Sequence, residues 1–237
     1  PEGYWRIGSR NWHPQELATH DAFEVMPDEV WGWYLYRRGV CRAATPNAAH
    51  EALVKAEAAL GERFLLVTQN VDGLHLRAGN TLPRTFQIHG NVDFHRCAEE
   101  CSDPVPIGEA IPLTWEKGRV PGDAERAVLR CGRCGARTRP HVLWFDESYD
   151  EPRYRFVSSL RAAQACAMLV VVGTSGATNL PLQMASIVAD RGVPFVVLNP
   201  EESPYSELAS ESRKGVVVPA TAGSSVPAIV EMLLSER

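Results

Sequence analysis

The sequence has no apolar run long enough to cross a bilayer and no excess of positive charge. A membrane-spanning helix needs roughly 20 apolar residues, and residues 1–20 do not resemble a signal peptide, so we expect a cytoplasmic protein. A net charge of −5 gives no general attraction to nucleic acid or to an anionic membrane, and we expect neither as a partner. There are no internal repeats or low-complexity tracts, and 237 residues suit one large domain or a domain with a smaller insert.

The second half of the chain alternates short apolar runs with helical patterns. The runs are continuous and rich in β-branched residues, as in strands buried on both faces. The alternation predicts an α/β fold, a Rossmann-like parallel sheet with helices on both faces. The expected strands are 63–70, 167–176, 194–200 and 215–220, and the expected helices are 46–60, 151–165, 180–191 and 223–235.

Two segments do not follow this alternation. Residues 14–44 have an all-helical pattern, while residues 92–141 carry four cysteines and a middle rich in Gly, Pro and charge. We therefore expect a helical module and a small zinc-binding module beside the main domain. The segment 92–141 has too few apolar residues to fold alone, and a bound metal would supply the missing stability. The predicted division is 1–13, 45–91 and 142–237 for the Rossmann-like domain, 14–44 for the helical module and 92–141 for the zinc-binding module.

Four of the six cysteines form two close pairs, CxxxC at Cys97 and Cys101 and CxxC at Cys131 and Cys134. Two thiolate pairs on tight turns suit tetrahedral Zn²⁺, with disulfides or unmetallated thiols as the alternative. No His or carboxylate at a suitable spacing offers an open coordination position, so the zinc would be structural. The remaining Cys41 and Cys166 are expected to be buried thiols.

Polar residues follow three of the expected strands. Gln69, Asn70 and Asp72 in "VTQNVDGLH" come after the first strand, where open α/β sheets bind ligands, although capping of the next helix explains Asn70 and Asp72 equally well. "VVVGTSG" (170–176) can cradle a phosphate or ribose but lacks GxGxxG spacing, and "VVLNPE" (196–201) has a simple turn as its alternative.

A histidine in "FQIHGNVDFHRCAEEC" (86–101) stands at the end of an apolar run. His89 could be a reagent, a metal ligand or a packed core residue, and the local stretch does not decide among them. His95 fits neither a catalytic nor a metal-binding motif, and we expect a surface or packing role for it.

Taken in order, these motifs resemble a known family. "TQNVDGLH", "IHG", the two cysteine pairs, "RPHVLWFDE", "GTS" and "LNPE" are similar to the sirtuins, the NAD-dependent protein lysine deacylases, from residue 3 to residue 233. The resemblance implies NAD as co-substrate, one structural Zn²⁺ and acyl-lysine proteins or peptides as substrates.

The resemblance also assigns roles to residues. His89 is the implied catalytic base: the acyl oxygen attacks the nicotinamide ribose, nicotinamide leaves, and the histidine takes a proton from a ribose hydroxyl before water completes transfer of the acyl group to ADP-ribose. The implied NAD contacts are Gln69, Asn70, Asp72, Gly173, Thr174, Ser175, Asn199, Glu201 and Ala222.

"VLWFDE" matches the sirtuin segment that receives the substrate peptide as an added strand. Trp144 and Phe145 would help line the acyl-lysine tunnel, with core packing as the alternative. The implied peptide-binding residues are Val142, Leu143, Trp144, Phe145, Asp146 and Glu147.

Tyr34 and Arg37 share a helix face in "WYLYRR" and match the sirtuin branch that removes succinyl, malonyl and glutaryl groups. A guanidinium and a phenol can bind a carboxylate together, so we expect a preference for acidic acyl groups. A solvated arginine on an amphipathic helix is the alternative.

The sequence departs from the sirtuin pattern in places. It begins at "PEGYW", and we expect the strand, GAGxS loop and FRG motif of sirtuins to precede Pro1 in the complete protein. Asp146 replaces the usual Gly of "FGE", and the Pro after "GTS" comes one position late. The rival functions are an NAD hydrolase or ADP-ribosyltransferase, a non-catalytic NAD or ADP-ribose reader, and a zinc-ribbon nucleic-acid module, which the acidic balance disfavours.

Overall fold

The chain divides into two compact units in the computed structural model, which describes residues 5–7 and 9–235. Unit 1 consists of Pro1–Thr45, Thr68–Leu74 and Gln87–Ser148, and unit 2 consists of Pro46–Val67, His75–Phe86 and Tyr149–Arg237. Residues 1–4 and 8 of the predicted 1–13 segment lie outside the described residues. Parts of the predicted Rossmann-like domain, such as residues 142–148, group with the helical and zinc-binding segments. They pair with β5 (Gly90–Cys97) or pack on α2 (His20–Val25) and α3 (Pro27–Ala43).

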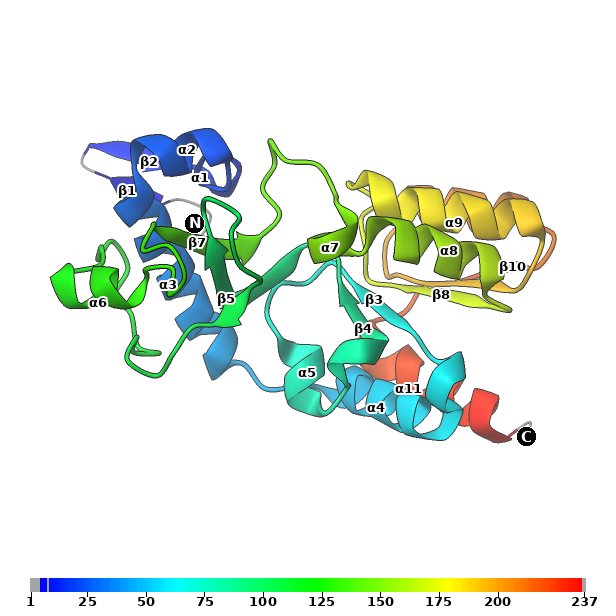
Figure 1. Ribbon diagram of the computed structural model, residues 1–237. Coiled ribbons are helices and arrows are strands. Elements are labelled where there is room, and N and C mark those ends of the chain that lie inside the picture. Colours follow the sequence, from blue (N-terminus) through cyan, green and yellow to red (C-terminus); the bar gives the residue numbers. More distant parts are fainter. Residues whose placement is uncertain (1–4, 8, 236–237) are drawn as a thin grey trace. The chain divides into compact units, whose positions relative to one another are not determined.

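Unit 2 contains a three-stranded parallel sheet in the order β10-β9-β8. Small apolar residues of α4 and α11, such as Ala52 and Val226, pack against sheet residues such as Leu198 on one face, and α8 and α9 cover the other face (Figure 1). The predicted parallel sheet with helices on both faces is confirmed. Its elements are β8 (Leu169–Val172), β9 (Phe195–Leu198), β10 (Gly215–Val218), α4 (Ala48–Leu60), α7 (Glu151–Tyr154), α8 (Phe156–Ala165), α9 (Asn179–Arg191), α10 (Pro204–Glu211) and α11 (Ala222–Ser235).

Helix boundaries in unit 2 follow local chemistry. Asn47 accepts the backbone N–H groups of Ala49 and His50 at the start of α4, and Gly192 ends α9 in the left-handed conformation with φ 64°. The single helix expected over 151–165 is wrong: it is broken at Arg155, which has φ 55°. Glu151 stabilises the restart by accepting hydrogen bonds from the backbone and hydroxyl of Ser158.

Two short strands end just before predicted site residues, one directly before Gln69 and the other shortly before His89. β3 (Leu66–Thr68) and β4 (Thr85–Gln87) pair with each other in a separate two-stranded sheet. α5 (Leu74–Ala78) and the 3-10 turns Gly61–Arg63 and Leu82–Arg84 connect them to their neighbours.

Unit 1 has an antiparallel sheet in the order β6-β5-β7 and a tryptophan-rich core. The long helix α3 supplies Val30, Trp31, Tyr34 and Leu35 to that core, a spacing that places them on one face. The all-helical pattern expected over 14–44 is confirmed. The elements are β1 (Trp5–Ile7), β2 (Arg10–Trp12), α1 (Pro14–Leu17), α2 (His20–Val25), α3 (Pro27–Ala43), β5 (Gly90–Cys97), β6 (Val105–Pro106), α6 (Asp123–Val128) and β7 (Thr138–Val142).

The irregular segment 107–119 packs along α3. A Cβ added at Gly32 would lie 2.3 Å from the carbonyl oxygen of Arg119, and one at Gly39 would lie 2.4 Å from that of Leu113. Buried Arg38 pairs with Asp93 of β5. Two glycines seven residues apart therefore let the backbone of this segment approach the helix closely.

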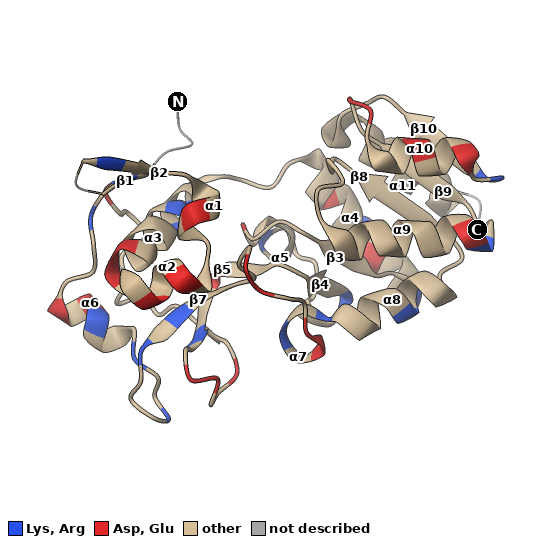
Figure 2. Ribbon diagram, turned by 90° about the horizontal axis from the view of Figure 1, so that it is seen from above, with Lys and Arg blue, Asp and Glu red and all other residues tan. Residues whose placement is uncertain are grey.

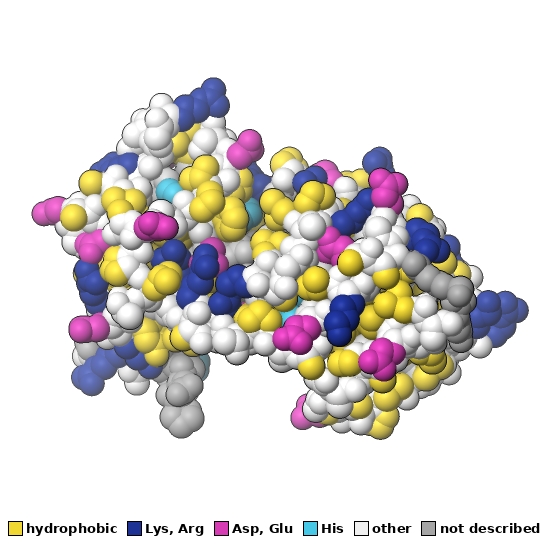
Figure 3. Space-filling model, turned by 90° about the horizontal axis from the view of Figure 1, so that it is seen from below, with side chains coloured by type: hydrophobic (Ala, Val, Ile, Leu, Met, Phe, Trp, Pro, Cys, Tyr) yellow, Lys and Arg dark blue, Asp and Glu magenta, His cyan; other side chains and the backbone are white. Residues whose placement is uncertain are grey.

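Charged residues of both signs are spread over the helices, strands and loops (Figure 2). On the face drawn in Figure 3, basic and acidic side chains are interspersed with apolar ones. In the part of the chain that the structure describes, no helix combines the length and apolar character that crossing a membrane requires.

Candidate active site and metal centre

His89 is a half-buried residue between β4 and β5 in unit 1. Its Nδ1 lies 3.0 Å from the carbonyl oxygen of Gln69, so the neutral ring carries its proton on Nδ1 and its lone pair on Nε2. Burial lowers the pKa of His89, and the hydrogen bond to Gln69 opposes this only in part. The imidazole is therefore neutral near pH 7 and able to accept a proton.

The turn after His89 requires glycine. Gly90 has φ 85°, and a Cβ there would lie 2.1 Å from the carbonyl oxygen of His141 on β7. The amide of Leu143 donates to the carbonyl of His89 over 3.0 Å. These contacts fix the histidine backbone against the strand that leads into the predicted peptide-binding segment.

The polar residues after β3 lie beside this histidine within unit 1. Gln69 contributes its carbonyl to His89, and the amide of Asn70 donates to the hydroxyl of Thr68. Asp72 accepts the amide of Leu74 and so caps α5, which is the alternative that the sequence left open for it. The NAD-contact roles of Gln69, Asn70 and Asp72 stay predictions.

The remaining predicted NAD contacts gather at one edge of the unit 2 sheet. Gly173 to Ser175 follow β8, Asn199 and Glu201 follow β9, and Ala222 begins the helix after β10. Because the strands are parallel, their carboxyl ends share an edge. The side chain of Asn199 donates to the carbonyl of Thr174 over 3.3 Å, which links two of the three loops.

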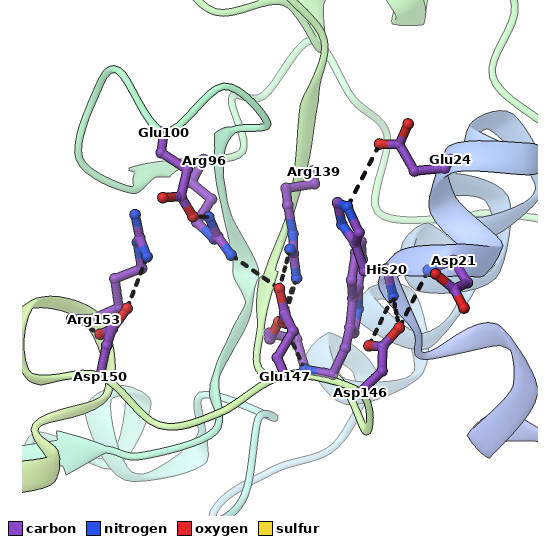
Figure 4. Close-up of polar contacts among 12 residues, drawn as sticks. His20, Asp21, Glu24, Arg96, Glu100, Arg139, Asp146, Glu147, Asp150 and Arg153 are labelled. Atoms are coloured by element: carbon purple, nitrogen blue, oxygen red, sulfur yellow. Dashed lines mark hydrogen bonds and ion pairs between the residues drawn. The ribbon is translucent and has the colours of Figure 1, made fainter.

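The segment after β7 is held by a buried ion pair. Both terminal nitrogens of Arg139 bind the carboxylate of Glu147, and Arg96 lies 3.5 Å from the same group (Figure 4). Burial raises the pKa of Glu147, but the hydrogen bonds and charge of Arg139 outweigh it, so the pKa is lowered and the group is ionised near neutrality. Arg139 was not among the predicted site residues, although it stands at the head of the motif "RPHVLWFDE".

Asp146 makes contacts that its glycine counterpart could not. Its carboxylate accepts the backbone N–H of His20 at 2.7 Å and 2.9 Å and that of Asp21 at 3.2 Å, at the start of α2 (Figure 4). The adjacent Phe145 donates its amide to the carbonyl of Ala18 and leaves its ring 69% exposed. The negative charge of Asp146 is therefore engaged by the N-terminus of α2.

Tyr34 and Arg37 lie together on α3, as their spacing predicts. The guanidinium of Arg37 stands 4.8 Å from the ring centroid of Trp33 and 6.0 Å from that of Tyr34. Among the residues that the structure describes, no acidic side chain pairs with Arg37. The hydroxyl of Tyr34 accepts a hydrogen bond from the indole of Trp144 over 3.0 Å.

The four paired cysteines form one cluster. The sulfur atoms of Cys97, Cys101, Cys131 and Cys134 all lie within 4.8 Å of one another, and the closest separations are 3.3–3.5 Å. A disulfide would require about 2.05 Å, whereas a tetrahedron of zinc–sulfur bonds of about 2.3 Å has edges of roughly 3.8 Å. The donor set fits Zn²⁺, and all six cysteines are free of disulfides.

Two residues with positive φ shape the turns that carry the cysteine pairs. Glu100 has φ 54°, which turns the three-residue spacer of CxxxC, and Gly135 with φ 72° closes the second knuckle. Hydrogen bonds from the backbone of Cys134 and from Ser102 lower the pKa of the Cys131 thiol to about 6.

The expectation that Cys41 and Cys166 are buried is wrong, because both are only half-buried. Buried His95 packs against Trp31, as expected.

Comparison with known proteins places this geometry in a family. The model of the Sir2 family matches residues 3–179. An NAD-dependent protein deacylase of Leptospira interrogans is 36% identical over 221 residues, which cover 92% of this chain and 81% of that protein. The mitochondrial NAD-dependent protein deacylase sirtuin-5 of Danio rerio is 35% identical over 252 residues, covering all of this chain and 77% of that protein.

Solved structures agree with the sequence comparison. A crystal structure of a Sir2 homolog in complex with NAD matches with a TM-score of 0.76 and 28% identity, covering 95% of this chain and 79% of that one. The family-model match spans more than half of the 237 residues, and the similarity to both relatives extends over nearly all of the chain. The chain therefore belongs to the Sir2 family.

Proposed function

We propose that the protein is an NAD-dependent protein lysine deacylase that prefers acidic acyl groups, and that it releases nicotinamide and O-acyl-ADP-ribose. The observation that carries the deacylase assignment is the state of His89: a neutral imidazole with Nδ1 anchored on Gln69 and its lone pair on Nε2. Such a ring accepts a proton from a ribose hydroxyl without first losing one of its own. NAD, as the co-substrate, supplies the electrophilic ribose carbon and the nicotinamide leaving group.

The substrate peptide is proposed to add as a strand along residues 142–147. The amides of Leu143, Trp144 and Phe145 already donate within the chain, to His89, Glu147 and Ala18. An added peptide would therefore bond chiefly to carbonyl groups of this segment and would donate its own N–H groups. This arrangement recognises backbone and leaves side-chain selectivity to exposed groups such as Phe145.

The preference for acidic acyl groups rests on Arg37. Its guanidinium lies over the rings of Trp33 and Tyr34 and lacks an acidic partner among the described residues. A partly buried cation without a counter-ion favours an incoming carboxylate, because the ligand then replaces hydration lost on binding. Succinyl, malonyl and glutaryl groups carry such a carboxylate, and an acetyl group does not.

The zinc ion is proposed to have a structural role. Cys97, Cys101, Cys131 and Cys134 would fill all four positions of a tetrahedral site, which leaves none for a substrate. Because thiolate ligands need to stay reduced, we propose a reducing compartment such as the cytoplasm.

The proposed function is tested with succinyl-lysine and acetyl-lysine forms of one peptide. We expect NAD-dependent loss of the succinyl group and formation of O-succinyl-ADP-ribose, both measured by mass spectrometry. Arg37→Met should lower kcat/KM for the succinyl peptide by about tenfold to a hundredfold, because a hydrogen-bonded charge contributes about 1.5–3 kcal/mol. Equal losses on both peptides would contradict the acyl preference. Free ADP-ribose formed without peptide would favour the rival NAD hydrolase.

A further inference from the structure

Trp144 makes an uncommon contact for a residue expected to line a tunnel. It is 1% exposed, and its indole Nε1 donates over 3.0 Å to the hydroxyl oxygen of Tyr34, which is 2% exposed. The bond joins the segment after β7 to the middle of α3, across 110 positions of sequence. Both partners belong to unit 1.

The direction of this hydrogen bond is fixed by chemistry. An indole nitrogen can only donate, so the phenol oxygen of Tyr34 is the acceptor. The hydroxyl hydrogen of Tyr34 is then turned away from Trp144, which favours the phenol as a donor toward a further polar group. A donor complements a carboxylate, which only accepts, and offers nothing to the methyl group of an acetyl chain.

Trp144 is itself held in place by charged neighbours. The guanidinium of Arg139 lies 3.3 Å from the ring centroid, and Phe23 packs 5.4 Å away. Glu147 binds Arg139 through two oxygens and also accepts the amide of Trp144 over 2.9 Å. A cation over the ring face withdraws electron density from the indole and strengthens its N–H as a donor.

We propose that Trp144 is a specificity-determining positioning residue, which acts through Tyr34 by orienting its hydroxyl as a donor toward the carboxylate of acidic acyl groups. This inference rests on the proposed function, since it concerns the acyl pocket of the same reaction. It assigns the selectivity to a chain of contacts from Glu147 through Arg139 and Trp144 to Tyr34, in addition to Arg37.

The test is a double-mutant cycle on the full chain. Trp144→Phe keeps an aromatic ring against Arg139 and Phe23 but removes the N–H. Loss of one oriented hydrogen bond should lower the ratio of kcat/KM for succinyl over acetyl peptide by about three- to tenfold, mainly through KM for the succinyl peptide. In the Tyr34→Phe background the same change should leave the ratio unaltered within about twofold, because the group that Trp144 orients is gone.

A matched control comes from another buried indole of unit 1. Trp31 donates its Nε1 to the backbone carbonyl of Thr138 over 2.8 Å, so Trp31→Phe removes an equivalent indole hydrogen bond in the same core, one that does not end on the Tyr34 hydroxyl. It should lower the melting temperature without changing the succinyl-to-acetyl ratio. A ratio that falls as much in Trp31→Phe as in Trp144→Phe would show a general effect of destabilisation and overturn the inference.

The cycle also separates this inference from the proposed function. If the wild-type protein shows no preference for the succinyl peptide, both the acyl preference and this inference are wrong. If the wild type prefers succinyl and Trp144→Phe retains that preference, or if the two substitutions act additively, only the role of Trp144 is overturned.

Discussion

At the scale of single residues, the histidine at position 89 is tuned by burial more than by charge. Burial lowers its pKa, and the Gln69 carbonyl offsets this only in part. Because the neutral ring is the active form, lowering the pKa extends activity toward acid. The pH dependence of deacylation should therefore report this group directly.

We predict that kcat/KM is flat above about pH 6.5, the ordinary value for histidine, and falls as the pH drops through a lower apparent pKa. The pH profile is measured with both the succinyl and the acetyl peptide. The base acts on a ribose hydroxyl whichever acyl group is bound, so the fall in activity at acid pH should be the same for the two peptides. His89→Ala should abolish turnover, whereas NAD binding, measured by calorimetry, should persist. An acid limb centred above 6.5, or turnover in His89→Ala, would remove the assignment of the base.

Asp146 stands where the sirtuin motif "FGE" has glycine, and its carboxylate accepts N–H groups at the start of α2. Asp146→Ala should lower the free energy of unfolding by about 1 kcal/mol, as the loss of a helix cap does. It should also raise KM for the peptide, because the segment 142–147 loses its bonds to the start of α2. Asp146→Asn keeps an acceptor and should recover most of the loss. Exposed Asp103 is the control, and Asp103→Ala should change neither quantity.

At the scale of secondary-structure elements, α3 serves two surfaces. One face supplies Tyr34 to the unit 1 core, and Arg37 stands close by, while Gly32 and Gly39 admit the backbone of residues 107–119. The residues proposed to bind the acyl group and the irregular segment are thus supported by the same helix. A substitution at Gly32 or Gly39 that displaces α3 should therefore also displace Tyr34 and Arg37.

We predict that Gly39→Ala lowers the free energy of unfolding by about 1–3 kcal/mol, the usual range for overpacking. Alanine raises helix propensity, so the loss would come from the clash with the carbonyl of Leu113 alone. Gly223→Ala at the start of α11 is the matched control, since its added Cβ meets nothing within 4 Å and should be neutral or slightly stabilising. Denaturant unfolding compares the two, and a neutral Gly39→Ala would show that residues 107–119 move aside freely.

The sequence predicts elements better than contacts. Periodicity placed the strands of unit 2, and capping residues such as Asn47 and Gly192 marked helix ends, because these signals are local. The break at Arg155 was missed since a left-handed arginine has no composition signal. The ordered motifs pointed to His89, but the bond from Trp144 to Tyr34 joins residues 110 positions apart, and only tertiary packing defines it.

At the scale of the whole molecule, the tryptophans and the metal cluster are unevenly distributed. All six tryptophans, at positions 5, 12, 31, 33, 115 and 144, belong to unit 1, as do the four clustered cysteines. Unit 2 has its own parallel sheet and helix core without either. Tryptophan fluorescence therefore reports on unit 1 alone, whereas circular dichroism reports on the helices of both units.

This distribution allows the role of zinc to be tested without an activity assay. We expect one zinc ion per chain by elemental analysis, lost in Cys131→Ser and retained in Cys166→Ser, because Cys166 lies outside the cluster. Chelation should red-shift the tryptophan emission as β5 and β7 lose the cross-link that holds residues 97–134, since structural zinc contributes directly to folding. Most of the helical dichroism should survive, because α4, α8, α9 and α11 form unit 2. Unchanged emission after complete removal of zinc would mean that the unit 1 core holds without the metal.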